Sequence, residues 1–157
     1  MEFTFKPIGV IKTGYSEKEG TPIQGAFHPE NKASIELHRE YVKGLTDLEG
    51  FSHIILLYVF HKAGECRSLQ KPFLDDVARG VFAIRSPKRP NPLGLTTVKL
   101  EQIVGGTLHV SGVDVLDGTP LLDIKPYIPD FDVKKDVKVG WMLNKNRGEG
   151  LSDDRFS

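Results

Sequence analysis

The stretch LTTVKLEQIVGGTLHVSGVDVLDGTPLLDIKPY, residues 95–127, decides the fold class of this chain. It contains three short runs rich in Val, Ile and Leu, at residues 95–103, 107–115 and 121–127. Apolar and polar residues alternate in the first run, as they do in a strand with one buried face. Gly105-Gly106 separates the first two runs and indicates a hairpin connection. Short strands at this spacing, without helical periodicity, are typical of an all-β barrel or sandwich.

The sequence upstream continues the same pattern. Further strands are predicted at residues 3–11, 34–38, 53–61 and 81–84. The run at 53–61 is nearly all apolar and fits a central strand covered on both faces. Between these strands we expect a short helical turn within 39–48 and a loop or short helix at 62–79. Residues 12–33 hold several Gly and Pro residues and form a long connection, which in a compact domain is often functional.

Length and composition narrow the class of protein further. A chain of 157 residues is expected to form one domain with a substantial core. We expect this domain to span residues 1–143, followed by a polar, Gly-rich tail or oligomer arm at 144–157. The 21 basic and 21 acidic side chains create no global field that would attract nucleic acid, so any RNA contact must be local.

Cysteine usage and hydropathy point to the cellular compartment. Cys66 is the single cysteine, which excludes an intrachain disulfide and suits a reducing cytosol. The N-terminus lacks the apolar run of a signal peptide, and no apolar stretch approaches the length of about 20 residues needed to span a membrane. We therefore expect a cytoplasmic protein without a membrane anchor.

Residues 80–92, GVFAIRSPKRPNP, form a segment that we call the proline segment. Its three prolines fix their own φ angles and hold the preceding residues extended. Arg85, Lys88, Arg89 and Asn91 therefore lie on a stiff support, and preorganised guanidinium groups suit carboxylate or phosphate ligands. From composition alone, a proline-rich surface loop with incidental charge is an equally good interpretation.

The proline segment and the segment DVLDGTPLLDIKPY at residues 114–127 resemble the TrmO-like family, also called TsaA-like or YaeB-like. Blocks at residues 8–11, 22–24 and 45–53 keep the family's order, so the resemblance covers about residues 3–132. It implies a β-barrel that binds S-adenosylmethionine. It also implies a homodimer that methylates N6 of threonylcarbamoyl-adenosine beside the tRNA anticodon. Bacterial members carry a further C-terminal domain, whereas this sequence continues only briefly after the predicted barrel.

The resemblance also implies a set of cofactor residues. They are Pro22, Ile23, Gln24, His61, Lys62, Arg85, Leu95, Asp117, Gly118, Thr119 and Pro120. Their chemistry fits, because the cofactor's carboxylate prefers an arginine and its adenine prefers an apolar slot. A plain hairpin turn at Asp117-Gly118, a strand-end histidine at His61 and an ordinary loop residue at Gln24 remain alternatives. The Gly-rich turn of a Rossmann-type enzyme is missing, since no glycine cluster opens a helix after a strand.

Two further groups of residues are assigned to the reaction and to RNA. Asp123 and Tyr127 lie on the polar face of an alternating strand and are candidates for removing the N6 proton, although the pattern alone favours a plain solvated strand face. Lys88, Arg89 and Asn91 are expected to form the RNA-facing edge, with Arg85 closer to the strand. The five histidines are scattered, so we expect no metal site.

The sequence leaves competing functions open. The first is a methyltransferase that acts on another RNA or on a small molecule. The second is a barrel that binds S-adenosylmethionine or RNA without catalysis. Retention of all the cofactor blocks favours an enzyme.

Overall fold

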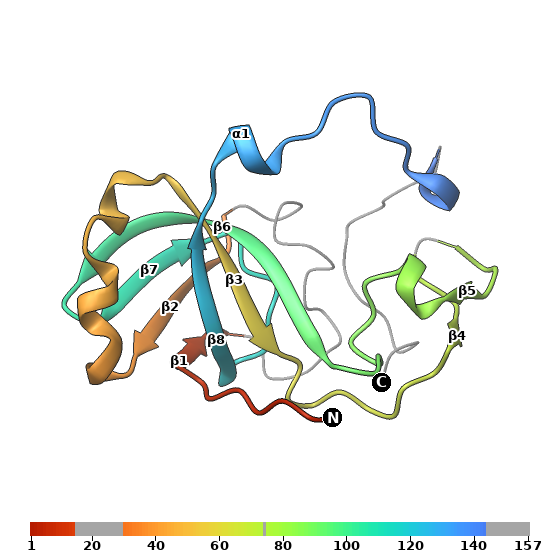
Figure 1. The fold of residues 1–157 in the computed structure, drawn as a ribbon, viewed down its shortest axis with the longest axis horizontal. Helices are drawn as coiled ribbons and strands as arrows, with labels where there is room; N and C mark the ends of the chain where they lie inside the picture. Colours follow the sequence, from red (N-terminus) through yellow and green to blue (C-terminus); the bar gives the residue numbers. More distant parts are fainter. Residues whose placement is uncertain (15–29, 74, 144–157) are drawn as a thin grey trace.

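The computed structural model describes residues 1–14, 30–73 and 75–143, and its centre is a closed antiparallel barrel (Figure 1). Around the barrel the strands follow the order β1-β2-β7-β6-β3-β8. Their bounds are β1 Gly9–Lys12, β2 Lys32–Leu37, β3 His53–Val59, β6 Leu93–Val104, β7 Thr107–Ser111 and β8 Thr119–Pro126. The all-β prediction is confirmed, and closure of the sheet decides for the barrel over the sandwich.

Short elements connect the strands, as predicted. They are the 3-10 turns η2 (Arg39–Leu45), η3 (Leu48–Gly50) and η4 (Val81–Ala83), and a small sheet of β4 (Leu69–Gln70) and β5 (Arg79–Gly80). The short α-helix α1 (Pro129–Asp132) and the 3-10 turn η5 (Gly140–Met142) follow β8. The helical turn expected within 39–48 corresponds to η2. Among the described residues no helix is long and apolar enough to cross a membrane.

Two predicted strands differ most from the observed ones, and a third, predicted at 107–115, ends at Ser111. The segment expected as a strand at 81–84 instead contains the turn η4, in which the Ile84 amide donates to the Val81 carbonyl. This turn buries two side chains that are three residues apart, Val81 and Ile84. The first strand starts at Gly9 instead of Phe3, and the Phe3 and Phe5 side chains are 75% and 68% exposed. Apolar composition alone therefore overestimated both segments.

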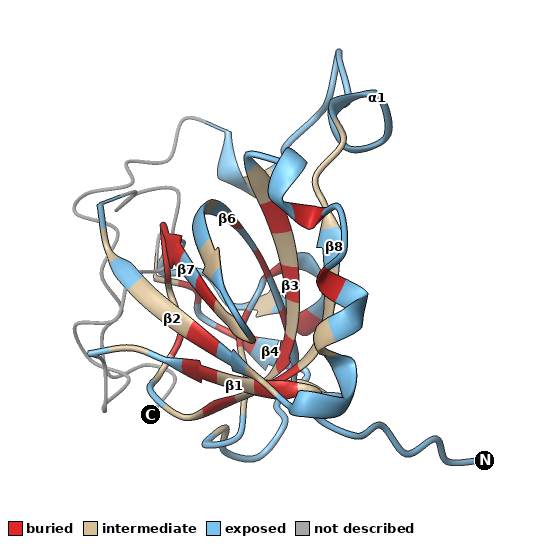
Figure 2. Ribbon diagram, turned by 90° about the vertical axis from the view of Figure 1, so that its left-hand side faces the viewer, coloured by how far each residue is buried: buried red, intermediate tan, exposed pale blue. Residues whose placement is uncertain are grey.

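Alternate side chains of the barrel strands fill its interior. In β3 the side chains of Ile54, Leu56 and Tyr58 are buried, and Figure 2 shows buried and half-buried residues alternating along this strand. The remaining residues of β3 are half-buried, so the prediction that this strand is covered on both faces is wrong. The outer side chains of β3 and its neighbour β6 form a surface that we call the outer apolar face: Leu57, Val59, Leu93 and Leu95.

A glycine lets the largest interior side chain fit into the barrel wall. Gly94 on β6 lies opposite Tyr58 on β3, and the Tyr58 ring occupies the space that a side chain at Gly94 would need. A Cβ atom built on Gly94 would lie 2.2 Å from Cε2 of Tyr58. The absence of a side chain at this position therefore allows Tyr58 to lie flat against the neighbouring strand.

The antiparallel strands give the barrel two distinct ends. At one end β1 and β3 stop while β6 and β8 begin, and we call it the proline-loop end because the proline segment leads into β6 there. Beyond β8 the chain continues through residues 127–143, which we call the C-terminal arm. In Figure 1 this arm passes through α1 at the opposite end of the barrel and extends to η5, beside the β4–β5 sheet.

Candidate functional site

The proline-loop end brings together most of the predicted cofactor residues that the structure describes. His61 and Lys62 directly follow β3, the proline segment precedes β6, and residues 117–120 lead into β8. These segments meet because β6, β3 and β8 are adjacent in the barrel. The Phe60 amide donates to the Pro92 carbonyl at 2.8 Å and ties the first two segments together. Pro22, Ile23 and Gln24 lie outside the described residues.

The proline segment is held in shape by its own Arg89 and by Gln70, which lies outside it. The Arg89 guanidinium donates through Nη1 to the carbonyls of Ile84 (3.0 Å) and Ser86 (3.2 Å). Gln70 Nε2 donates to the Lys88 carbonyl at 2.7 Å. Capped carbonyls and fixed proline φ angles leave this segment little freedom.

The order of exposure along the proline segment differs from the prediction. Lys88 was expected further out than Arg85, but Lys88 is only 5% exposed, whereas Arg85 is exposed. The segment turns inward at Lys88, whose side chain packs beside Gly64. Of the residues expected to face RNA, Asn91 is exposed and Arg89 is half-buried. The structure therefore gives the cation at Arg85 the more accessible position.

Arg85 lies in the electrostatic surroundings of two groups from the barrel. Burial raises the pKa of the Tyr58 hydroxyl well above its usual value, and the charge of Asp114 raises this pKa further. The positive charge of Arg85 acts on the same hydroxyl in the opposite direction. Arg85, Asp114 and Tyr58 therefore converge at the proline-loop end, with a guanidinium at the surface.

The turn at residues 116–119 fixes the start of β8 against the end of β1. The Thr119 amide donates to the Leu116 carbonyl at 3.3 Å, and Gly118 supplies the positive φ of +81° that this turn requires. Oδ1 of Asp117 accepts a hydrogen bond from the Thr13 amide at 2.9 Å. The alternative of a plain hairpin is wrong, because β7 and β8 are not neighbours in the barrel. Asp117 is exposed, so its carboxylate is accessible to a ligand.

His61 and Leu95 border the outer apolar face. Partial burial lowers the pKa of the His61 imidazole, the charge of Lys62 lowers it further, and a hydrogen bond with the Val59 backbone opposes these effects. A neutral imidazole is therefore favoured next to a cationic ligand. Leu95 is 47% exposed and lies opposite Leu57, which together offer an apolar wall for a planar ring.

The two predicted catalytic residues lie at different heights of the barrel. Asp123 faces Leu57 across β3 and β8, in the same row as Leu95. Its Oδ2 pairs with Nζ of Lys125 at 2.8 Å, a contact that raises the pKa of Lys125. Tyr127 lies at the opposite end, where its amide donates to the His53 carbonyl. Tyr127 lies four positions after Asp123, about 13 Å along an extended chain, so the structure brings only Asp123 towards the predicted cofactor residues.

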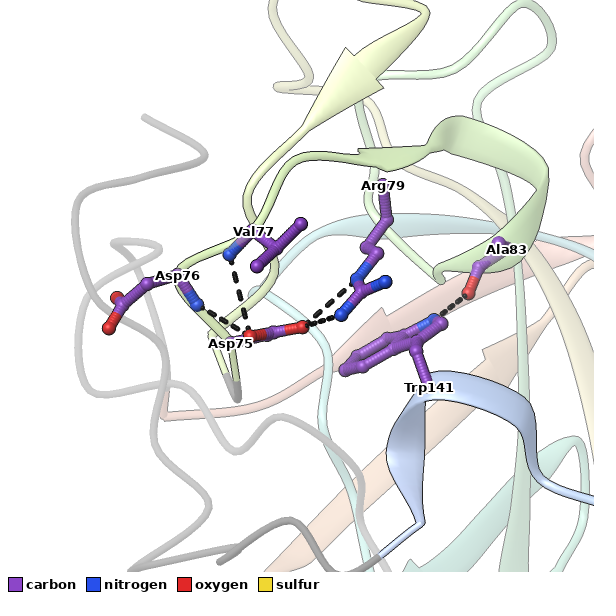
Figure 3. Close-up of polar contacts among 6 residues, drawn as sticks. All are labelled: Asp75, Asp76, Val77, Arg79, Ala83 and Trp141. Atoms are coloured by element: carbon purple, nitrogen blue, oxygen red, sulfur yellow. Dashed lines mark hydrogen bonds and ion pairs between the residues drawn. The ribbon is translucent and has the colours of Figure 1, made fainter.

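Sequence reasoning missed several residues that shape this end of the barrel. Gly94 belongs to no motif that the sequence analysis identified, and Tyr58 lies in an apolar run that predicts only a strand. Trp141 belongs to the C-terminal arm, yet its indole Nε1 donates to the Ala83 carbonyl at 2.8 Å, in the first part of the proline segment (Figure 3). It is the single tryptophan of the sequence, which was the available signal. Among the described residues, no group of three or more His, Cys, Asp or Glu side chains is placed to hold a metal ion.

Comparison with known proteins agrees with this architecture. Residues 10–133 match the family model of the tRNA-methyltransferase O N-terminal domain. The chain belongs to this family. A crystal structure of TrmO superposes with a TM-score of 0.77 at 39% sequence identity, covering 89% of this chain and 64% of that one. A second TrmO structure, from Pseudomonas aeruginosa, gives a TM-score of 0.76 at 38% identity over 90% of this chain and 63% of the other.

Relatives of the family differ in length and in the activity that their names state. A probable S-adenosyl-L-methionine-binding protein of Pyrococcus abyssi is 44% identical, with 96% of this chain and 82% of that protein covered. A tRNA (adenine(37)-N6)-methyltransferase of Rattus norvegicus is 40% identical over 94% of this chain. This chain spans 36% of the rat enzyme, so it corresponds to one part of the longer relative.

Proposed function

We propose that this protein is an S-adenosylmethionine-dependent methyltransferase that acts on N6 of threonylcarbamoyl-adenosine next to the tRNA anticodon. The observation that carries the proposal is that the segments bearing most of the predicted cofactor residues reach the proline-loop end, on strands that the barrel makes adjacent. Family membership supports the proposal, as do the name of the Pyrococcus relative, which states S-adenosylmethionine binding, and that of the rat relative, which states N6 methylation of adenine 37 in tRNA.

The geometry suggests how the cofactor is held. Arg85, exposed at the start of the proline segment, would bind the carboxylate of S-adenosylmethionine. Leu95 would pack against the adenine, because its exposed side chain forms an apolar wall with Leu57. The turn at residues 117–120 would offer backbone groups and the Asp117 carboxylate to the ribose or the ammonium group. His61, Lys62 and residues 22–24 complete the proposed cofactor set.

Methyl transfer requires alignment more than chemical assistance. S-adenosylmethionine would supply the methyl group: N6 would attack the methyl carbon, and the electron pair of the broken carbon–sulfur bond would return to sulfur as a thioether. N6 loses a proton, which leaves to a base or to water. Alignment of nucleophile, methyl carbon and sulfur supplies most of the acceleration of such a displacement. The protein's contribution is therefore a rigid site, which the capped proline segment offers.

Asp123 is the better placed of the two proposed proton acceptors. It shares a row with Leu95 and carries a carboxylate that is 43% exposed. Its Oδ2 pairs with Nζ of Lys125 at 2.8 Å, and a carboxylate is a group that can accept a proton. Tyr127 would contribute only if the substrate extended to the opposite end of the barrel.

We propose that the RNA-facing edge lies at the outer bend of the proline segment. Asn91 is exposed there, and Arg89 is partly accessible although its Nη1 caps two carbonyls. Lys88 is buried, so we assign it to support of the segment. The net formal charge of zero means that a few local contacts must supply the attraction to phosphate.

A homodimer in the cytoplasm is the assembly that best suits these surfaces. Leu93 and Leu95 are each 47% exposed beside the half-buried Leu57 and Val59. A second copy of the chain would cover this outer apolar face, which borders the proposed cofactor site. The cytoplasmic location follows from the proposed tRNA substrate and from the single exposed cysteine.

Nucleoside analysis decides between the proposed function and its alternatives. The protein, S-adenosylmethionine and tRNA that carries threonylcarbamoyl-adenosine would be incubated, and the digested nucleosides measured by mass spectrometry. Methylation of that nucleoside supports the proposal. Cofactor binding without transfer would favour a binding protein, the property that the name of the Pyrococcus relative states. Transfer to a different nucleoside or to a small molecule would redefine the substrate.

A further inference from the structure

Trp141 fastens the C-terminal arm to the turn that precedes the proposed cofactor arginine. Figure 3 shows its indole beside the Arg79 guanidinium, whose central carbon lies 5.4 Å from the ring centroid. Arg79 in turn pairs with Asp75, to which its Nε donates at 2.9 Å. The indole Nε1 donates to the Ala83 carbonyl at 2.8 Å. We call this set of four residues the indole clamp.

The indole clamp joins two parts of the chain that are distant in sequence. Asp75 lies between β4 and β5, Arg79 begins β5 and Ala83 ends η4, whereas Trp141 lies in η5. Within the connection, Oδ1 of Asp75 also accepts hydrogen bonds from the amides of the next two residues, which orients its carboxylate towards Arg79. Main-chain amides therefore orient the Asp75 carboxylate, this carboxylate holds the Arg79 guanidinium, and the Trp141 indole lies against that guanidinium.

The clamp holds the main chain at Ala83, close to the arginine proposed to bind the cofactor. Ala83 lies two residues before Arg85, at the end of the segment opposite to the Phe60–Pro92 tie. Between these points, Arg89 and Gln70 fix the carbonyls of the bend. Trp141 supplies its tie from a position 58 residues along the chain. Without it, the turn η4 would lose a restraint that comes from outside the segment, and Arg85 follows that turn directly.

The arm offers a reason why the tie is specific to Trp141. Val137, Val139 and Leu143 on either side of it are 62%, 51% and 66% exposed, so they add little packing. Trp141 is half-buried and combines a directed hydrogen bond with a ring contact to a cation. The local stability of the arm against the η4 turn therefore depends mainly on this side chain.

We propose that Trp141, held by Arg79 and Asp75, is a positioning residue for Arg85. The clamp fixes the path of the main chain at Ala83 and thereby the direction in which the guanidinium leaves the proline segment. S-adenosylmethionine then binds to a site whose arginine is already ordered, which lowers the entropy cost of binding. This inference rests on the proposed function, because it concerns the arginine proposed to bind the cofactor carboxylate.

The variant Trp141→Phe tests the clamp with little other change. Phenylalanine keeps a ring beneath Arg79 but removes the N–H that donates to Ala83. The expected result is S-adenosylmethionine binding weakened about three- to tenfold by calorimetry, the loss that follows from one hydrogen bond. The KM for the cofactor should rise by a similar factor while kcat at saturating cofactor stays within about twofold, because the ordered site is reached once the ligand binds.

A second measurement needs neither cofactor nor substrate. Amide hydrogen exchange of residues 81–86 in the free protein should accelerate in Trp141→Phe and, to a smaller degree, in Arg79→Gln. Met142→Leu is the matched control, since Met142 is adjacent in η5 and the clamp makes no use of its side chain. Its exchange, affinity and KM should all equal those of the wild type.

The outcomes separate the inference from the function on which it rests. Faster exchange with a raised cofactor KM supports the positioning role. Unchanged exchange of residues 81–86, or faster exchange with unaltered cofactor affinity, would overturn it. A lower melting temperature alone, with equal KM, would also overturn it by assigning Trp141 to stability only. If the wild-type protein binds no S-adenosylmethionine, the proposed function fails, whereas the exchange data still decide whether Trp141 holds the turn.

Discussion

Adding one methyl group at Gly94 should disturb both the barrel and the proposed site. An ideal Cβ at this position lies 2.2, 2.5 and 2.9 Å from three carbon atoms of the Tyr58 ring, where about 3.5 Å is the normal contact distance. Tyr58 is only 3% exposed, so the ring cannot move without displacing its neighbours. Overpacking of this kind costs about 1–3 kcal/mol. For a domain of this size, Gly94→Ala should lower the melting temperature by about 2–12 °C.

Thermal unfolding followed by circular dichroism measures this effect directly. Gly44→Ala is the matched control, because no atom outside its own neighbourhood lies within 4 Å of the added Cβ and the residue lies in the turn η2. The control should melt at or slightly above the wild-type temperature. Tyr58→Leu in combination with Gly94→Ala provides the second test, since removal of the ring removes the clash.

The double variant decides whether the steric reasoning is correct. In the Tyr58→Leu background, Gly94→Ala should cost at least about 1 kcal/mol less than it does in the wild type, a coupling expected for residues in direct contact. An equal cost in both backgrounds would refute the proposed contact. So would a Gly94→Ala protein that melts at the wild-type temperature with unchanged cofactor binding.

The remaining predictions concern the proline-loop end. Arg85→Ala should weaken S-adenosylmethionine binding about 10- to 150-fold in calorimetry, as loss of a charge-assisted hydrogen bond does; an unchanged affinity would move the carboxylate site elsewhere. Burial and the charge of Lys62 hold the pKa of His61 below 6.5. Cofactor affinity should therefore be full above that pH and fall as the pH drops through the lowered pKa, because a cationic imidazole repels the cationic cofactor. The affinity of a His61→Gln variant should not depend on pH in that range. Asp117→Ala should lower the free energy of unfolding by about 0.5–1.5 kcal/mol, because the hydrogen bond from the Thr13 amide is lost. Asp117→Asn keeps an acceptor oxygen and should keep most of the stability. Equal denaturant midpoints for the two variants would contradict this prediction.

Periodicity was sufficient to predict most of the barrel. The alternation in residues 95–103 and the Gly105-Gly106 connection correspond to β6, β7 and the turn between them. The all-apolar run at 53–61 was misleading in one respect, because it suggested two covered faces. A strand whose outer face is apolar gives the same sequence pattern whether the domain itself or a second chain covers that face.

The proximity of the site residues could not be derived from local patterns. His61, Arg85 and Asp117 lie on segments that reach the same end of the barrel only because the strands close in the order β6-β3-β8, which is a long-range property of the chain. The family resemblance supplied that grouping in advance. It could not predict that Lys88 is buried. The direction of each side chain in this proline-rich bend depends on the hydrogen bonds that Gln70 and Arg89 donate to its carbonyls.

The contribution of Trp141 shows the same limit for packing. A lone tryptophan near a polar tail indicates an anchor but does not name its partner. The partner is the carbonyl of Ala83, and a sequence does not indicate which main-chain carbonyl will accept a hydrogen bond. The bulky ring at Tyr58 and the glycine opposite it are likewise paired by register alone.

Transfer of a labelled methyl group tests both the proposed reaction and the proposed role of Arg85. Methyl groups labelled in S-adenosylmethionine would be followed into tRNA bearing threonylcarbamoyl-adenosine, with the wild-type protein and Arg85→Ala compared at the same subsaturating cofactor concentration. We expect the label on N6 of that nucleoside with the wild type, and at least about tenfold slower labelling with the variant. A wild-type protein that transfers no label to this nucleoside at saturating cofactor would contradict the proposed reaction.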